Sequence, residues 1–300
     1  MKVGVYVPVG NHAASPQPWR DVLAFGSRAE ALGFDGLWVP DHTLFRFPDQ
    51  PERGAHEAWS VLTALAATTS TIPLGTLVLG LRFRNPALLA KMAATTDEIS
   101  GGRLTLGVGA GWHDPEYEAF GFPLDHRLGR TEEAFELLVR LIRDGRASMD
   151  GRWVQAADAA ILPPARPDMR ILSSARGGRM VGIVARFADA TNIAWMARPT
   201  DPVLLERMAG LDAACEQQGR DPATLERTVG VSVRYPDATA PGASPDPTKR
   251  IEGDPASPAL VADALRAFAD AGYPEIMIWL EPMDVGSLER LAASVELLRR

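Results

Sequence analysis

Short runs of Val, Ile and Leu alternate with longer segments of helical periodicity along the whole chain. Such near-continuous apolar runs are typical of strands covered on both faces, and the helices between them then connect parallel strands. This alternation predicts a parallel α/β fold. We expect strands at residues 2–8, 34–40, 74–79, 103–108, 170–174, 189–194, 228–233 and 275–280.

Eight strands are the number that a (β/α)8 TIM barrel requires, and 300 residues are an ordinary length for one. We therefore predict a single barrel domain over residues 1–300. An open, doubly wound sheet is the structural alternative. It is disfavoured because no GxGxxG glycine pattern follows the first strand.

Capping residues mark the ends of the predicted helices. Gly33 follows the first helix, expected over 18–32, where a C-terminal glycine cap belongs. Ser100-Gly101-Gly102 ends the helix before the fourth strand. A proline in the first turn opens helices at Asn85-Pro86, Asp201-Pro202 and Ser257-Pro258.

Two segments lie outside the minimal βα repeat. Residues 145–168 contain a DGRW turn, which indicates a small hairpin excursion. Residues 236–258 are rich in Pro, Ala, Gly and Asp, and we expect a mobile surface loop there.

Composition narrows the possible partners. The formal net charge is −7 and no basic stripe is present, so we expect neither nucleic acid nor an anionic membrane as a partner. Local arginines can still hold a phosphorylated small molecule. Without a long apolar run or a signal-peptide pattern, a cytoplasmic location is expected. The histidines are not spaced as metal ligands usually are, and Cys215 is the single cysteine of the sequence. We therefore expect no metal site.

In α/β barrels the active site lies where the strands end and the βα loops begin, so residues at these junctions are the candidates for it. Candidate site residues lie at or just after the ends of several predicted strands. They are Asp41 and His42, Leu77 and Val78, Ala110, Gly111 and Trp112, Ala175, Arg176, Gly177, Gly178 and Arg179, and Trp195.

Five segments in order carry a family resemblance. They read GFDGLWVPDH, LGTLVL, FRNPALLAKMAATTDEISGGRLTLGVGAGW, EYEAFGFP and the terminal LEPMDVGSLERLAASVELLRR. Together they resemble the luciferase-like monooxygenase superfamily, most of all its branch that uses coenzyme F420, a deazaflavin.

The resemblance implies an oxidoreductase that moves hydride between F420 and an unidentified small organic substrate, in a protein that is commonly a homodimer. One alternative is a two-component monooxygenase that uses reduced FMN and oxygen, with a flavin reductase as partner. A second alternative is a non-catalytic, flavin-binding barrel.

His42 is the proposed catalytic residue. It ends a strand in a PDH turn, and histidine titrates near neutral pH. A histidine in such a turn can also serve only to hydrogen-bond its loop. The resemblance places His42 at the cofactor face, where we expect it to donate a hydrogen bond or a proton. The same match implies that Asp41 contacts the cofactor ring or fixes the histidine.

The resemblance also assigns roles to the third and fourth junctions. It implies a cis peptide bond at Leu77–Val78 that presses on the back of the tricyclic ring. Many flavin-using relatives carry an arginine near Ala110, so Ala110 followed by Gly111 is more similar to deazaflavin users. An acidic proton donor of the related sugar-phosphate dehydrogenases falls at Trp112, so that activity is not expected. We expect Trp112 and Trp195 to line the substrate pocket.

An anion site is predicted at the start of the helix after the fifth strand. Gly177 and Gly178 leave backbone N–H groups exposed at a helix N-terminus, which favours a phosphate. Ala175 precedes them, and Arg176 or Arg179 would add a charge-assisted contact. Arg127 and Arg130 are weaker candidates for the same phosphate. All of these predictions require that the Gly177 loop and His42 lie at one rim of the barrel.

Overall fold

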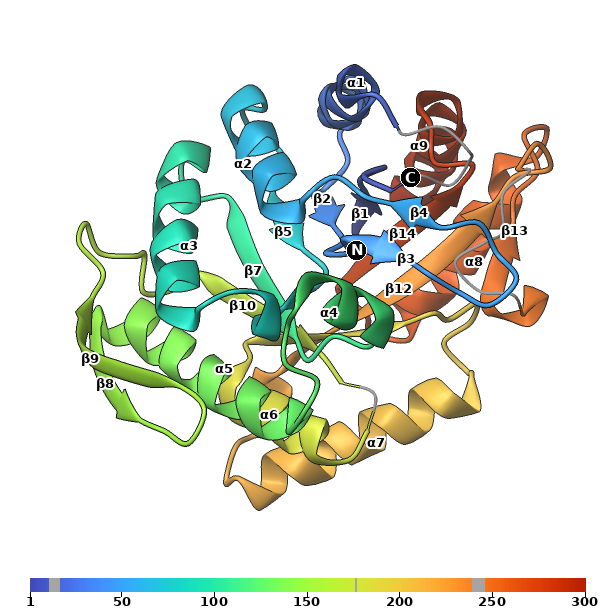
Figure 1. Ribbon diagram of the computed structural model, residues 1–300. Helices are drawn as coiled ribbons and strands as arrows, with labels where there is room; N and C mark the ends of the chain where they lie inside the picture. The colour runs from blue at the N-terminus through green and yellow to red at the C-terminus, as the bar shows by residue number, and fades with distance from the viewer. Residues whose placement is uncertain (11–16, 176, 239–245) are drawn as a thin grey trace.

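The computed structural model describes residues 1–10, 17–175, 177–238 and 246–300 (Figure 1). Strands in the described part are β1 (Lys2–Tyr6), β2 (Gly36–Val39), β3 (Leu44–Phe45), β4 (Arg53–Gly54), β5 (Leu74–Thr76), β6 (Leu79–Gly80), β7 (Leu104–Gly109), β8 (Arg146–Asp150), β9 (Gln155–Ala160), β10 (Arg170–Ser174), β11 (Ala190–Ala194), β12 (Glu226–Arg234), β13 (Arg250–Glu252) and β14 (Glu275–Glu281). The α-helices are α1 (Trp19–Ala31), α2 (Ala58–Thr68), α3 (Pro86–Ser100), α4 (Asp114–Phe120), α5 (Arg127–Asp144), α6 (Arg179–Phe187), α7 (Pro202–Gln217), α8 (Pro258–Asp270) and α9 (Val285–Arg299).

Parallel strands close into a barrel, with the helices arranged around it (Figure 1). The order around the barrel in the described residues is β1, β2, β5, β7, β10, β11, β12, β14 and back to β1. Pairing of β10 with β7 closes one side, and pairing of β14 with β1 closes the other. The predicted TIM barrel is confirmed.

The indole of Trp38 on β2 occupies the barrel interior and is 3% exposed. A Cβ on Gly4 of β1 would lie 2.4 Å from its Nε1, and a Cβ on Gly75 of β5 would lie 2.7 Å from its Cζ3. Both strands pair directly with β2. One bulky residue therefore fits because each neighbouring strand presents a glycine beside it.

The predicted helix boundaries are confirmed. Asn85 Oδ1 accepts hydrogen bonds of 3.0 Å from the amides of Ala87 and Leu88, which caps α3. Asp201 caps α7 through the amide of Val203. Gly33 follows α1, Gly101 follows α3 and Ser257 precedes α8, as expected.

The excursion between α5 and β10 is the antiparallel hairpin of β8 and β9, in agreement with the prediction for 145–168. Its turn closes with a 3.0 Å hydrogen bond from Gly151 N to Val154 O. Glu133 on α5 accepts hydrogen bonds from the backbone amides of Arg152, Trp153 and Val154. The hairpin is thereby anchored to the helix before it.

The prediction of a surface loop over 236–258 is wrong in part. Residues 239–245 lie outside the described residues, but Arg250–Glu252 forms β13 and pairs in parallel with β12. Ile251 is 8% exposed and packs in the main core. The sequence did not predict β13 because three residues with one buried side chain are too few to show the periodicity of a strand. The surrounding segment is also rich in proline and glycine.

The described helices include none that is both long enough and apolar enough to cross a membrane. Among the same residues, no group of three or more His, Cys, Asp or Glu side chains is arranged to hold a metal ion.

Candidate active site

The carboxyl ends of the barrel strands open into a cavity of about 910 Å³. Residues that follow different strands line it together, which is the convergence that the sequence predicted. Those already singled out are Asp41, His42, Leu77, Val78, Ala110, Gly111, Trp112, Ala175, Gly177 and Trp195. His42 and Gly177 therefore share one rim and one cavity.

His42 is held by a carboxylate that the sequence did not single out. Its Nδ1 lies 3.0 Å from Oε1 of Glu116 on α4, and Glu116 is 1% exposed. Thr43 donates to the same carboxylate from its amide at 2.9 Å and from its hydroxyl at 3.2 Å. Burial opposes ionisation of Glu116, but the hydrogen bonds from His42 and Thr43 outweigh it and lower the pKa of Glu116.

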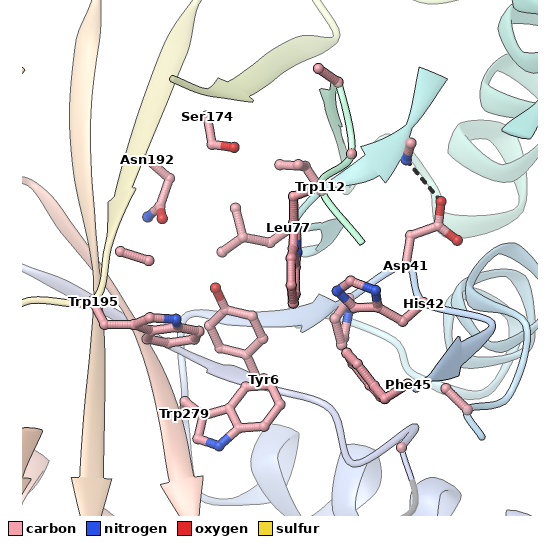
Figure 2. A pocket seen from close by; sticks show the side chains of 18 of the residues that line it. Tyr6, Asp41, His42, Phe45, Leu77, Trp112, Ser174, Asn192, Trp195 and Trp279 are labelled. Atoms are coloured by element: carbon pink, nitrogen blue, oxygen red, sulfur yellow. Dashed lines mark hydrogen bonds between the residues drawn. The ribbon is translucent and has the colours of Figure 1, made fainter. Parts of the chain in front are cut away.

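An ionised Glu116 can only accept hydrogen bonds, so Nδ1 of His42 carries the proton. The second ring nitrogen, Nε2, is then the one that can exchange a proton with a bound molecule. Phe45 and Trp112 flank the imidazole, with ring centroids 4.4 and 5.5 Å from it (Figure 2). Trp112 lines the cavity as expected, although it is 46% exposed.

Asp41 is tied to the segment after the third barrel strand. Its carboxylate accepts a hydrogen bond from Gly80 N at 2.9 Å (Figure 2). It also accepts from two nitrogens of Arg84 at 2.7 and 3.1 Å. Arg84 also pairs with Glu57. The residue that fixes His42 is therefore Glu116, and Asp41 instead joins the end of β2 to β6. Its contact with a cofactor ring stays a prediction.

The third strand is interrupted, as the resemblance implied. The peptide bond Leu77–Val78 is cis and separates β5 from β6, where one strand over 74–79 was expected. Val78 lies against Gly109 of β7, where a Cβ would come within 2.8 Å of its Cγ2. Both Leu77 and Val78 line the cavity. Their pressure on a cofactor ring remains a prediction.

Ala110 and Gly111 form the part of the wall that follows β7. The carbonyl of Ala110 accepts a 3.1 Å hydrogen bond from Arg82, which is itself 7% exposed. A Cβ on Gly111 would lie 1.8 Å from the hydroxyl of Tyr117. Backbone and small side chains therefore form this wall, and a larger residue at Gly111 would displace Tyr117.

The predicted anion site splits between two hollows. Gly177 lines the main cavity and also a second pocket of about 810 Å³, which runs along α6 and α7. Gly178 and Arg179 line the second pocket, where Arg179 pairs with Glu132 of α5. Arg179 thus lines the second pocket and not the main cavity, and its contact with a phosphate stays a prediction. Arg176 lies outside the described residues.

Two other arginines bring positive charge toward Gly177. Arg207 of α7 lines both hollows, as Gly177 does, and Arg127 at the start of α5 lines the main cavity. Arg127 pairs with Asp114 and Arg130 pairs with Asp125 at 3.0 Å, but Arg130 is not among the residues that line the cavity. Of the two weaker phosphate candidates, Arg127 is the one that the fold brings to the cavity. Arg207 gave no local signal in the sequence, because it lies within a helix.

Three aromatic rings form the wall across from His42 (Figure 2). Ring centroids lie 5.4 Å apart for Tyr6 and Trp195, 5.3 Å for Tyr6 and Trp279, and 5.6 Å for Trp195 and Trp279. A second non-prolyl cis peptide, Ala194–Trp195, precedes one of them and was not foreseen. Trp195 was expected in the pocket; Tyr6 and Trp279 were missed because they read as ordinary strand residues.

Comparisons with known proteins identify the family of this chain. Residues 1–240 match the model of the luciferase-like monooxygenase family. Over 236 residues the chain is 30% identical to pyrimidine monooxygenase RutA of Escherichia coli (strain SMS-3-5 / SECEC), which covers 74% of this chain and 64% of the relative. The chain thus spans less than two thirds of the length of that relative.

Solved structures share the fold. The coenzyme F420 dependent tetrahydromethanopterin reductase from Methanopyrus kandleri superposes with a TM-score of 0.76 at 16% identity, over 98% of this chain and 97% of that one. Monooxygenase RslO1 from Streptomyces bottropensis gives 0.76 at 20% identity, over 100% of both chains. Because residues 1–240 match the family model, this chain belongs to the luciferase-like monooxygenase family.

Proposed function

We propose that this enzyme uses coenzyme F420 to transfer hydride to or from a small organic substrate. The observation that carries the proposal is that one cavity is lined by His42, by the interrupted strand at Leu77–Val78 and by Gly177. Ala110 in the wall favours the deazaflavin over FMN, because many flavin-using relatives place an arginine there. The similar F420-dependent reductase supports the same choice.

The lining residues fit a phosphorylated tricyclic group. The volume of about 910 Å³ lies within the range of roughly 300–1,000 Å³ that small-molecule sites span. A Cβ on Gly177 would meet no atom within 4 Å, so its backbone stands open to a ligand. Gly177, Arg207 and Arg127 would hold the phosphate, and Leu77 and Val78 would support the ring. When bound, a deazaflavin supplies a carbon centre that gives or takes hydride and reacts poorly with oxygen.

The residues around the cavity would control one proton and exclude water. Nε2 of His42 takes a proton from a substrate hydroxyl on oxidation, or returns it on reduction. Glu116 then stabilises the imidazolium through Nδ1, since the two atoms already lie 3.0 Å apart. The aromatic wall of Tyr6, Trp195 and Trp279 orients the substrate and keeps water from it.

A titration of the purified protein with oxidised F420 and with FMN tests this proposal. Quenching of the fluorescence of either molecule reports binding. We expect F420 to bind at least about tenfold more tightly than FMN, which corresponds to about 1.4 kcal/mol. Tight FMN binding without measurable F420 binding would contradict the proposal. A protein that binds neither molecule would support a non-catalytic barrel.

The second candidate function is that of a monooxygenase using reduced FMN and oxygen, with a flavin reductase as partner. The 30% identity to a pyrimidine monooxygenase favours it. Oxygen uptake in the presence of reduced FMN and a flavin reductase would distinguish it, because the F420 proposal requires no oxygen uptake above that of the reductase alone.

We also propose that the enzyme is a homodimer, in line with the family it belongs to. Sedimentation equilibrium should give about twice the chain mass of 32.3 kDa. A single species at the monomer mass up to high protein concentration would contradict this proposal.

A further inference from the structure

One lateral row of residues crosses the four neighbouring strands β1, β14, β12 and β13 along the wall of the cavity. Ser232 on β12 pairs with Trp279 on β14 and with Arg250 on β13. Val5 pairs with Ile278, so the next residues along, Tyr6 and Trp279, are also neighbours. Laterally paired residues of a parallel sheet point to the same face. In agreement with this, Tyr6, Trp279 and Arg250 all line the cavity.

The aromatic end of this row offers a surface for an apolar group. Tyr6, Trp279 and Trp195 contact one another with centroid distances of 5.3–5.6 Å, and Tyr6 is 4% exposed. Rings packed at this spacing accept a further ring in a stacked or edge-on arrangement. The wall is otherwise apolar, and its polar groups are the indole nitrogens of the two tryptophans and the phenol of Tyr6.

Arg250 supplies a cation at the other end of the row. Its side chain is 19% exposed, whereas that of its partner Glu252, 2.6 Å away, is 61% exposed. Water screens such an exposed carboxylate, so the pair is weak and Arg250 retains attraction for an anion. Arg234 on the neighbouring strand differs, because its partner Glu281 has a side chain only 6% exposed and lies 2.8 Å from it.

Two carboxylates also line the cavity, and each is held by other residues of the site. Asp41 is paired with Arg84, and Glu116 accepts hydrogen bonds from His42 and Thr43. Adjacent strands lie about 4.8 Å apart, so the backbones of Trp279 and Arg250, two strands apart, are separated by about 10 Å. A ligand that spans both ends of the row carries its acid a few bonds from its ring.

We propose that the substrate is a small organic acid whose ring or apolar body packs on Tyr6, Trp195 and Trp279 and whose carboxylate binds Arg250. This inference rests on the proposed function only in treating this side of the cavity as the substrate side. Binding of the acid itself requires no cofactor.

Calorimetric titration of the cofactor-free protein with 3-phenylpropionate tests the proposal, with 3-phenylpropionamide and butyrate as matched ligands. We expect the acid to bind at least about tenfold more tightly than its amide, as hydrogen bonds to charged groups are the stronger ones. Butyrate, which lacks the ring, should bind more weakly than 3-phenylpropionate. Equal binding of acid and amide, or no binding of either, overturns the proposal whatever cofactor the enzyme uses.

Variants of the cavity arginines then locate the acid. Arg250→Gln should abolish the preference for acid over amide and leave the affinity for the amide unchanged. Trp279→Leu should weaken acid and amide alike. Arg53→Gln and Arg127→Gln remove cations that line the same cavity from β4 and α5, and both should keep the preference. Loss of the preference in either of these two, with Arg250→Gln unaffected, overturns the assignment.

Failure of this proposal and failure of the cofactor proposal are separable. A protein that binds F420 but shows no preference for the acid retains its proposed function with a different substrate class. A protein that prefers the acid but binds FMN in place of F420 retains this substrate class with a different cofactor.

Discussion

At the scale of single residues, the pair of His42 and Glu116 determines how a proton can move in the cavity. A carboxylate that is 1% exposed and remains ionised fixes which imidazole nitrogen carries the proton. The same carboxylate also stabilises a protonated, positively charged imidazole, which the surrounding aromatic rings would otherwise disfavour. In this scheme Glu116 does not contact the substrate. It acts through His42 as a positioning residue.

Glu116→Gln should therefore slow turnover by roughly 10²-fold with little change in substrate KM, because a neutral amide stabilises the imidazolium poorly. His42→Asn should cost as much or more. The double variant should be no slower than His42→Asn within about threefold, since Glu116 has no role once the imidazole is gone. Steady-state kinetics of the three variants measure this.

Independent, multiplicative losses in that double variant would show that Glu116 supports the site only structurally. Thr43→Val provides a matched control: it removes the hydroxyl donor to Glu116 but keeps the amide donor and the contact with His42. Its turnover should stay within a few-fold of the native enzyme. The sequence could indicate His42 from its place after a strand, but Glu116 lies 74 residues away and becomes visible only once α4 packs on that loop.

At the scale of elements, the start of α6 presents backbone rather than side chains to the cavity. Gly177 has φ of 110°, a region that residues with a side chain rarely adopt, and Gly178 follows with φ of 57°. Because α6 begins at Arg179, its first amides have no partner within the helix and can receive an anion.

Gly177→Ala should weaken cofactor binding by about tenfold or more, because the added methyl group forces the loop out of this conformation. Gly272→Ala is the matched control: its φ is 87°, a Cβ there also meets no atom within 4 Å, and it lies far from the cavity in the turn after α8. Both variants should lose similar thermal stability. Equal cofactor affinity in the two would show that Gly177 does not hold the phosphate.

The carboxylate of Glu30 joins the C-terminal end of α1 to the segment that precedes β5. Glu30 accepts hydrogen bonds from the backbone amides of Ser70, Thr71 and Ile72 at 2.6–3.0 Å. Burial opposes ionisation of Glu30, but these bonds, with that of the Thr71 hydroxyl, outweigh it and lower its pKa from 4.5 to about 2.

A carboxyl whose pKa is lowered on folding stabilises the fold above its unfolded pKa and loses that effect as the pH falls through the folded value. The native protein should therefore melt at a higher temperature than Glu30→Gln at pH 7. The gap should narrow from pH 4.5 toward pH 2, as measured by circular dichroism. A gap that stays constant over this range would mean that Glu30 is not ionised in the way described.

The sequence predicted most elements because their signals are local. Strands of four or more apolar residues and caps such as Asn85-Pro86 depend on neighbours within one turn. The break at Leu77–Val78 came from family resemblance, since LGTLVL alone reads as one strand. β13 and the cis bond before Trp195 gave no local signal, because each depends on packing against a strand elsewhere in the barrel.

At the scale of the whole molecule, closure of the barrel assembles the cavity from segments that are distant in sequence. Tyr6 on the first strand meets Trp279 on the last because β1 pairs with β14, and His42 and Gly177 face one space because their strands end at the same rim. The chain carries a net charge of −7, yet the side chains that line the cavity include five arginines, Arg53, Arg127, Arg207, Arg234 and Arg250. Arginines are therefore concentrated at this rim, although Arg234 pairs with Glu281 and Arg127 with Asp114.

Closure itself depends on how Trp38 fills the interior. Gly4→Ala should destabilise the protein by about 1–3 kcal/mol, as overpacking of a full core does, because the new Cβ would lie 2.4 Å from the indole nitrogen. Trp38→Leu alone should also destabilise it, by leaving a void. In the double variant the smaller leucine makes room for the alanine, so the loss should be less than the sum of the two single losses. Urea unfolding of the four proteins measures this coupling, and strictly additive losses would mean that the strand accommodates the methyl group without Trp38.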